Sequence, residues 1–161
     1  EAANLSDKNL ADDIKNRLLE KGWQENHIKA ISGEDVRWSR GNTNFKTVLA
    51  WLKNNSDSDD IILLFISAHG SEEGFIRLGD EAMKYSELAT ELEALKYDGL
   101  LIVLHSCFGE TAFPALKKEN RVIIVPLERS IPFNEAIFGF GDLEGNNDGW
   151  VSAEEIYNYY Y

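Results

Sequence analysis

The chain has 161 residues, of which 43% are hydrophobic and 27% charged, the balance of a folded globular protein. Its 28 Asp and Glu outweigh its 16 Lys and Arg, which gives a formal net charge of −12. Such a charge repels phosphate backbones, so nucleic acid is not an expected partner, and no apolar run is long enough to span a membrane. We expect one soluble domain over residues 1–161.

Helix-like and strand-like segments alternate along the chain. Apolar residues at helical spacing predict helices over residues 6–21, 44–53 (capped by Thr43), 85–97 and 111–118. Strands are expected at residues 27–32, 61–66, 100–104 and 121–127, with a polar loop at 33–43 and a small hairpin arm at 74–78. The run Ile61–Ile66 is too continuous for a half-exposed strand, so both its faces are expected to be covered. This pattern predicts an α/β fold, a mostly parallel sheet flanked by helices on both faces.

Two of the apolar strands end in residues that carry chemistry. The first is followed by His69 and Gly70, and the second by Cys107, the single cysteine, and then Gly109. Parallel strands bring their carboxyl ends to one edge of a sheet, where active sites of such sheets lie. There His69 is expected to take the thiol proton of Cys107 and later give it to a leaving amine. The backbone amides of Gly70 and Cys107 are expected to bind the oxyanion.

A third residue at this edge, His105, precedes Cys107 by two positions and so shares its strand face. It is open to three interpretations: the base, a wall of the substrate pocket, or a histidine satisfied at a strand end. The pocket wall is favoured, because a base on the same strand rarely has the geometry to approach the thiol.

The motifs Ser-x-His-Gly-Ser and His-Ser-Cys-x-Gly, each after a buried strand, resemble those of the caspase-like cysteine peptidases. The likeness is to the legumain-like and clostripain-like branch and its prokaryotic relatives. It implies a three-layer caspase-like sandwich and a thiol protease with His69 and Cys107 as its dyad. Such an enzyme cleaves peptides after one type of P1 residue, the residue on the acyl side of the scissile bond, and needs no cofactor for the chemistry. The family begins with a central strand before its first helix, and no such strand precedes Ser6.

The resemblance also places His105 against the P1 side chain. An acidic residue there suits Arg, Lys or Asn, and His does not, so the choice between Arg or Lys and Asn or Asp stays open. Glu128, Ser130 and Glu135 follow the next strand and are candidates for an acidic wall of the substrate-binding pocket.

An acidic loop over residues 143–156 matches the EF-hand pattern of calcium ligands. The expected ligands are Glu144, Asn146, Asp148, the Trp150 carbonyl, Ser152 and bidentate Glu155. Hard oxygen ligands at alternate positions suit Ca²⁺, although Glu144 stands where the shorter Asp is usual. We expect a structural calcium ion that holds the last helix, residues 152–160. A weak site suited to millimolar calcium favours a secreted or extracytoplasmic setting. The alternative is a solvated acidic turn that caps this helix.

Two function classes follow. The leading hypothesis is a cysteine endopeptidase acting on a peptide or protein substrate. The second is a catalytically silent caspase-like module that uses calcium and its acidic face to bind a partner, and it is favoured if His69 and Cys107 are misaligned. An α/β-hydrolase elbow needs a Gly where His105 stands, and the spacing of the His and Cys residues matches no zinc template.

Overall fold

The structure, a computed structural model, describes residues 10–125, 145–148, 152, 154–155 and 158. The chain divides into two compact units, residues 1–125 and 126–161. The described elements of the first unit are α1 (Leu10–Glu20), η2 (Glu25–His27), α2 (Phe45–Asn55), β1 (Ile61–Ser67), β2 (His69–Ser71), β3 (Phe75–Leu78), β4 (Glu81–Lys84), α3 (Tyr85–Leu92), β5 (Gly99–His105), η3 (Gly109–Ala112), α4 (Phe113–Leu116) and β6 (Arg121–Ile124).

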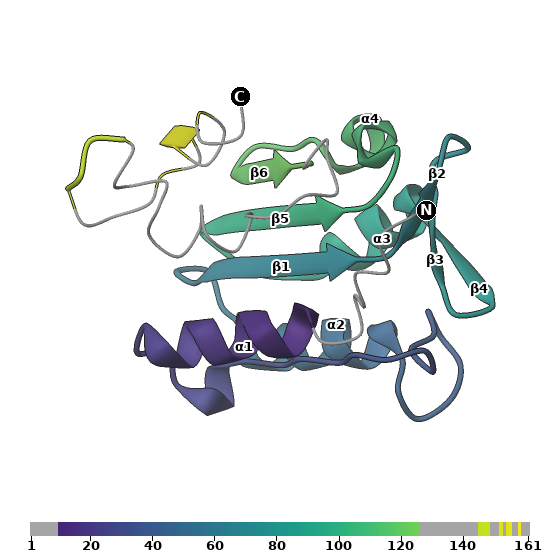
Figure 1. Ribbon diagram of the computed structural model, residues 1–161, viewed down its shortest axis with the longest axis horizontal. Helices are drawn as coiled ribbons and strands as arrows, with labels where there is room; N and C mark the ends of the chain where they lie inside the picture. The colour runs from purple at the N-terminus through teal and green to yellow at the C-terminus, as the bar shows by residue number, and fades with distance from the viewer. Residues whose placement is uncertain (1–9, 126–144, 149–151, 153, 156–157, 159–161) are drawn as a thin grey trace, which may run out of the picture. The chain divides into compact units, whose positions relative to one another are not determined.

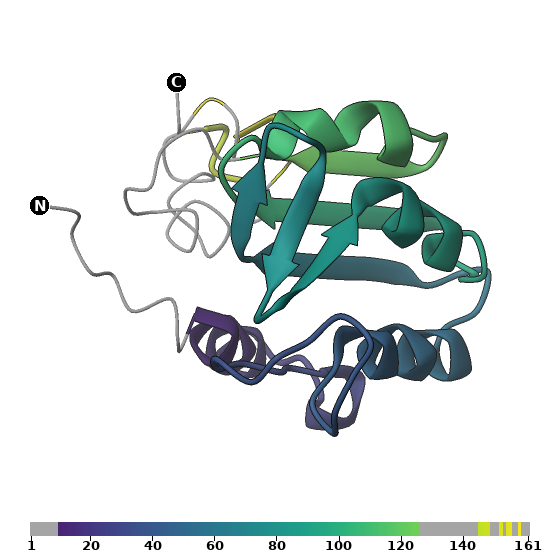
Figure 2. The ribbon, with the colours of Figure 1, turned by 90° about the vertical axis from the view of Figure 1, so that its right-hand side faces the viewer.

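The main sheet has the strand order β1-β5-β6, with all its described strands parallel (Figure 1). The register of β1 and β5 runs from Ile61 opposite Gly99 to Ser67 opposite His105. Helix α1 lies on one side of this sheet, and α2 and α3 lie on the other (Figure 2). The predicted α/β fold with a parallel sheet flanked by helices is therefore confirmed. No helix in the described part of the chain combines the length and the apolar character that crossing a membrane requires.

The core lies between the sheet and its helices. Ile102, Val103 and Leu104 of the central strand β5 are fully buried, as are Leu88 and Leu92 of α3. This burial explains why the strands form continuous apolar runs, since a parallel sheet covered on both faces leaves few polar positions.

A second, antiparallel sheet of order β2-β3-β4 begins two residues after β1 ends. It lies beyond the arrowheads of β1 and β5, at the carboxyl end of the main sheet (Figure 1). The hairpin arm expected around residues 74–78 is thus confirmed as β3, with β2 and β4 as partners. The hairpin places His69 on a strand rather than on a loop.

Three local predictions need correction. The strand expected at 27–32 does not form, because His27 ends the short helix η2 and the following residues pair with no described strand. Asn44, not Thr43, caps α2, since its side chain accepts a hydrogen bond from the Thr47 amide. The helix expected to reach Tyr97 ends as α3 at Leu92.

The polar stretch 33–43, expected to be an exposed loop, is tied to the β3–β4 hairpin. Trp38 is buried against Phe45, with ring centroids 6.0 Å apart. Arg40 pairs with Asp80 at 2.9 Å and with Glu81 at 2.8 Å. This loop therefore combines a buried aromatic side chain, Trp38, with exposed charged side chains around it.

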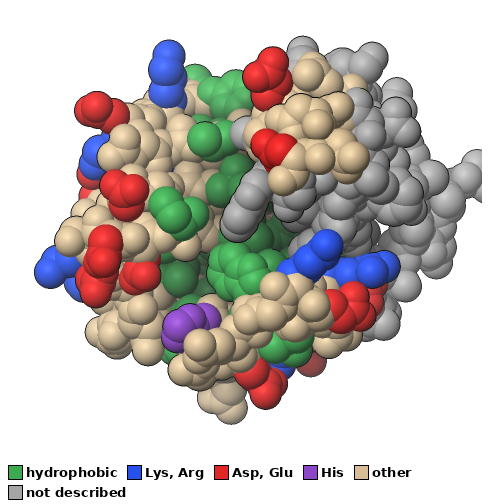
Figure 3. All heavy atoms as spheres, turned by 90° about the vertical axis from the view of Figure 1, so that its left-hand side faces the viewer, with side chains coloured by type: hydrophobic (Ala, Val, Ile, Leu, Met, Phe, Trp, Pro, Cys, Tyr) green, Lys and Arg blue, Asp and Glu red, His purple; other side chains and the backbone are tan. Residues whose placement is uncertain are grey.

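A cavity of about 730 Å³ lies along the outer side of β1. Its walls come from α1, α2 and residues 26–34, and one end reaches His69 and Arg77. Within the described sheet β1 is an edge strand, so this cavity lies where a further strand would continue the sheet. Figure 3 looks onto the end of the molecule where β1 begins and shows hydrophobic side chains gathered in a hollow.

Candidate active site

The parallel register aligns the two candidate catalytic residues. Ser67 and His105 are paired at the ends of β1 and β5, and His69 and Cys107 each lie two residues further along. Both side chains are exposed to solvent. The chain contains one cysteine, so Cys107 forms no internal disulfide. The register therefore places the ends of β1 and β5 side by side, two residues before His69 and Cys107.

Close backbone contact joins the two halves of this site. A Cβ atom built on Gly70 would overlap the carbonyl oxygen of Cys107 and would lie 3.3 Å from the Ser106 Cβ. Only glycine leaves room for the Cys107 backbone at this position. The first strand of the hairpin thus passes directly against the residue that carries the thiol.

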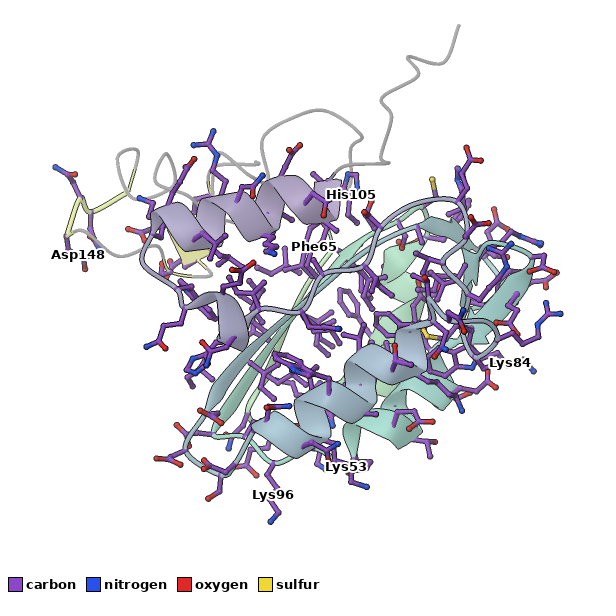
Figure 4. All side chains as sticks on the ribbon, turned by 90° about the horizontal axis from the view of Figure 1, so that it is seen from below. Lys53, Phe65, Lys84, Lys96, His105 and Asp148 are labelled. Atoms are coloured by element: carbon purple, nitrogen blue, oxygen red, sulfur yellow. The ribbon has the colours of Figure 1, made fainter. Side chains whose placement is uncertain are left out.

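His105 forms a hydrogen bond beneath these residues. Its Nδ1 atom lies 3.0 Å from the Ser67 Oγ, and both residues are half-buried. Figure 4 marks His105 at the end of β5. Ser67 was not singled out from the sequence, although it precedes His69 by two positions just as His105 precedes Cys107. This hydrogen bond joins the ends of β1 and β5, two residues before His69 and Cys107.

The turn after Cys107 is tightly packed. Phe108 takes a left-handed conformation with φ 56°, which costs a non-glycine residue about 1 to 2 kcal/mol. A Cβ on Gly109 would lie 2.7 Å from Val125 Cγ1 and 3.3 Å from the Ser106 Oγ. The backbone after Cys107 is therefore closely packed, and Gly109 is needed for its small size.

Tyr85 contacts Ser106, the residue before Cys107. Its ring is 2% exposed, and its hydroxyl lies 3.5 Å from the Ser106 Oγ. Burial raises the pKa of Tyr85, so the hydroxyl is neutral and able to donate at physiological pH. Tyr85 begins α3, and no motif in the sequence points to its contact with the residue before Cys107.

Several predicted site residues lie outside the described residues. They are the candidate pocket-wall residues Glu128, Ser130 and Glu135 and the candidate calcium ligands Glu144 and Trp150.

The described part of the acidic loop closes on Glu155. Its Oε1 accepts the Asn146 amide at 3.0 Å, and its Oε2 accepts the Ser152 amide at 2.8 Å. The Ser152 Oγ accepts the Glu155 amide at 3.1 Å, and the Asn146 Oδ1 accepts the Asp148 amide at 2.9 Å. The amides of Ser152 and Asn146 lower the pKa of Glu155, which keeps it ionised.

Four predicted ligands, Asn146, Asp148, Ser152 and Glu155, thus belong to one bonded loop. Both oxygens of Glu155 are held by backbone amides, and no cluster of three acidic, His or Cys side chains suited to a metal occurs among the described residues.

Comparison with models of protein families and with curated proteins finds no match.

Proposed function

We propose that the protein is a cysteine endopeptidase of the caspase-like type, with Cys107 as nucleophile and His69 as general base and acid. The observation that carries the proposal is the contact of Gly70 with Cys107 at the aligned ends of two parallel strands. An imidazole and a thiol delivered to one exposed edge are the two groups that acyl transfer needs.

The reaction follows from these two groups. His69 takes the thiol proton, and the thiolate forms a bond to the substrate carbonyl carbon. The C–N bond then breaks as the His69 imidazolium gives its proton to the leaving amine. Water, deprotonated by His69, attacks the thioester and releases the acid and the thiol. Amides of Gly70 and Cys107 are the proposed oxyanion donors.

The cavity along β1 supports the three-layer sandwich that the resemblance implies. It has helices on both sides and the edge of a parallel strand on a third, the surroundings of a strand in such a sheet. An additional strand in this place would make β1 an interior strand and bring the sheet closer to the expected architecture.

The proposal is tested with a library of peptides that vary at P1, and with the variants Cys107→Ala and His69→Ala. We expect cleavage that both substitutions abolish, and rapid alkylation of Cys107 near neutral pH in the wild-type protein. No cleavage, together with slow alkylation, would contradict the peptidase and favour the silent binding module.

We further propose that the acidic loop binds a structural calcium ion. Asn146, Asp148 and Glu155 offer the hard oxygen donors that Ca²⁺ prefers, and the bond from the Asn146 amide to Glu155 closes the loop. Bound calcium would supply no step of the hydrolysis. It would hold the loop to the segment that contains Glu155.

Calorimetric titration with CaCl₂ tests the calcium site. We expect binding with a dissociation constant on the order of 10⁻⁴ to 10⁻³ M, as in extracellular calcium modules. Asp148→Asn removes one charge and should weaken binding, while Lys53→Gln on α2 serves as a control for a charge change elsewhere. If titration of the wild-type protein with CaCl₂ gives no heat of binding, the calcium site is contradicted. Glu155 would then serve only as a helix cap.

A further inference from the structure

Phe108, the residue after Cys107, combines a strained backbone with an exposed aromatic ring. Its φ is 56°, in the left-handed region, and the residue is 41% exposed. The other non-glycine residues with positive φ in the described part of the chain are Asn120 and Asn147. Asparagine tolerates this conformation, whereas for a bulky residue it is an outlier. Such outliers cluster at functional sites, where the surrounding structure holds them in place.

Two hydrogen bonds hold Phe108 in this conformation. Its carbonyl oxygen accepts the Thr111 Oγ1 at 2.6 Å and the Thr111 amide at 3.1 Å. The next residue, Gly109, is buried against Val125, which leaves the turn little room to shift inward. The Cα–Cβ bond of Phe108 therefore has a fixed direction, and a ligand that packs on the ring does not have to order the backbone first.

Folding stability does not explain an aromatic ring at this position. An exposed ring gains only part of the free energy of burial, and a glycine would take the same φ without strain. Trp23 and Phe113 are exposed to a similar extent, at 42% and 41%, but neither has a positive φ. Phe108 therefore presents an apolar surface at a cost in folding free energy, which favours a role in binding.

The ring is next to the candidate nucleophile. Cys107 and Phe108 are consecutive and both exposed, and their Cα atoms are about 3.8 Å apart. A group bonded to the Cys107 Sγ is therefore within reach of the Phe108 side chain. The P1 residues considered above are polar or charged, and an apolar ring does not suit them. The ring suits an apolar side chain on the other side of the scissile bond.

We propose that Phe108 packs against an apolar side chain at P1′, the substrate residue on the amine side of the scissile bond. This inference rests on the proposed peptidase function and adds a preference at P1′ to it. The contact is present while Cys107 attacks the carbonyl and His69 protonates the leaving amine. It is lost when the amine departs with the P1′ residue. Phe108 is thus a specificity-determining residue and takes no part in proton transfer.

Peptides that share one acyl part and differ only at P1′ provide the first test. With the wild-type protein we expect kcat/KM to be about ten-fold higher for Leu or Phe at P1′ than for Ser, the effect of partly burying an apolar side chain. Phe108→Ala should abolish this preference, and Phe108→Trp should retain it. Trp23→Ala, which removes a similarly exposed ring, should leave it unchanged. A preference that Phe108→Ala does not alter would overturn the proposal.

A methyl ester of the same acyl part separates a contact with the substrate from a general effect on the turn. The ester has no P1′ side chain, so Phe108→Ala should hydrolyse it at the wild-type rate. A purely structural role of Phe108 would slow hydrolysis of the ester and of the peptides alike, and that result would also overturn the proposal.

Thermal unfolding tests the strain. Phe108→Ala keeps a Cβ atom on a residue with positive φ, and Phe108→Gly does not. Phe108→Gly should unfold about 2 to 4 °C above Phe108→Ala, and both should lack the P1′ preference. Asn120 lies at the opposite end of β5, where its carbonyl accepts the Leu100 amide at 2.9 Å, so Asn120→Gly should keep the preference. Equal midpoints for the two Phe108 variants would overturn the argument from strain.

A further test does not depend on peptide cleavage. N-phenylmaleimide and N-methylmaleimide are both uncharged, and both alkylate the thiol of Cys107, the single cysteine. Phe108→Ala should lower the ratio of the phenyl rate to the methyl rate about three-fold, as expected for loss of an aromatic pair. Trp23→Ala should leave the ratio unaltered.

These tests separate the two hypotheses. A lowered maleimide ratio in a protein that cleaves no peptide would contradict the peptidase and keep Phe108 as an apolar contact beside the thiol. Cleavage at equal rates with Leu and Ser at P1′, and a maleimide ratio equal in Phe108→Ala and wild type, would keep the peptidase and overturn the role of Phe108.

Discussion

Gly70 shows how a single missing side chain holds the candidate site together. A methyl group at this position would occupy the place of the Cys107 carbonyl oxygen, so Gly70→Ala must push the hairpin away from the thiol. We expect loss of peptide cleavage of at least about 100-fold, since misplacement of about 1 Å has that effect. Glu72→Ala is the control, because Glu72 is exposed in the turn of the same hairpin. Equal losses in the two variants would contradict the argument.

Glu81 should give the protein a pH-dependent element of stability. Its carboxylate accepts the Ser39 amide at 2.8 Å and the Arg40 Nε at 2.8 Å. The Ser39 amide above all, together with Arg40, lowers the pKa of Glu81 from 4.5 to about 2. A depressed pKa means that these bonds stabilise the folded state above pH 4.5 and are lost as the pH falls towards 2.

Urea unfolding at a series of pH values measures this contribution. The wild-type protein should lose more stability than Glu81→Gln between pH 4.5 and pH 2. Parallel curves for the two proteins in this window would show that Glu81 does not titrate with folding.

At the scale of elements, Asn44 anchors α2 and thereby one wall of the cavity. Its side chain accepts the Thr47 amide at 3.1 Å and donates to the Gly41 carbonyl at 2.8 Å, and the residue is 8% exposed. Asn44→Ala should lower the free energy of unfolding by about 1 to 2 kcal/mol, the upper part of the range for a helix cap. Asn55→Ala, at the exposed end of the same helix, should change it by less than about 0.5 kcal/mol. Thermal or urea unfolding of both variants distinguishes the cap from a general effect of Asn.

Long apolar runs explain which elements were predictable. The strands β1, β5 and β6 follow from continuous apolar sequence, because both faces of a parallel sheet are covered. The segment 27–32 mixes apolar and polar residues, and it forms no strand, since strand formation needs a neighbour to pair with and composition does not supply one. The short strand β2 was not expected, because His-Gly-Ser has no strand-like alternation. Its pairing depends on β3.

The candidate site was predictable only in part for the same reason. His69, Gly70 and Cys107 follow strand ends and could be placed at one edge from topology alone. Ser67 and Tyr85 contact the site through cross-strand and tertiary neighbours, which no local sequence pattern encodes.

Across the whole first unit, stability should depend on the central strand. Ile102 is fully buried, whereas Ile61 at the start of β1 is 64% exposed to solvent. Ile102→Ala should lower the free energy of unfolding by about 2 to 5 kcal/mol, and Ile61→Ala by less than about 0.5 kcal/mol. Urea titrations with equal slopes for the variants and the wild type would attribute the difference to the folded state. A larger effect at Ile61 would contradict the assigned core.

The strand order also predicts which strand of the main sheet opens first on warming. Cys107 follows β5, which has a partner on each side, whereas His69 follows β1, the edge strand of the described sheet. Edges of a sheet open at lower free energy than its centre, so amide protons of β1 should exchange with solvent before those of β5. The half of the site that carries the imidazole would separate while the half that carries the thiol is still folded. With the proposed dyad of His69 and Cys107, heat should therefore inactivate the protein several degrees before its secondary structure is lost.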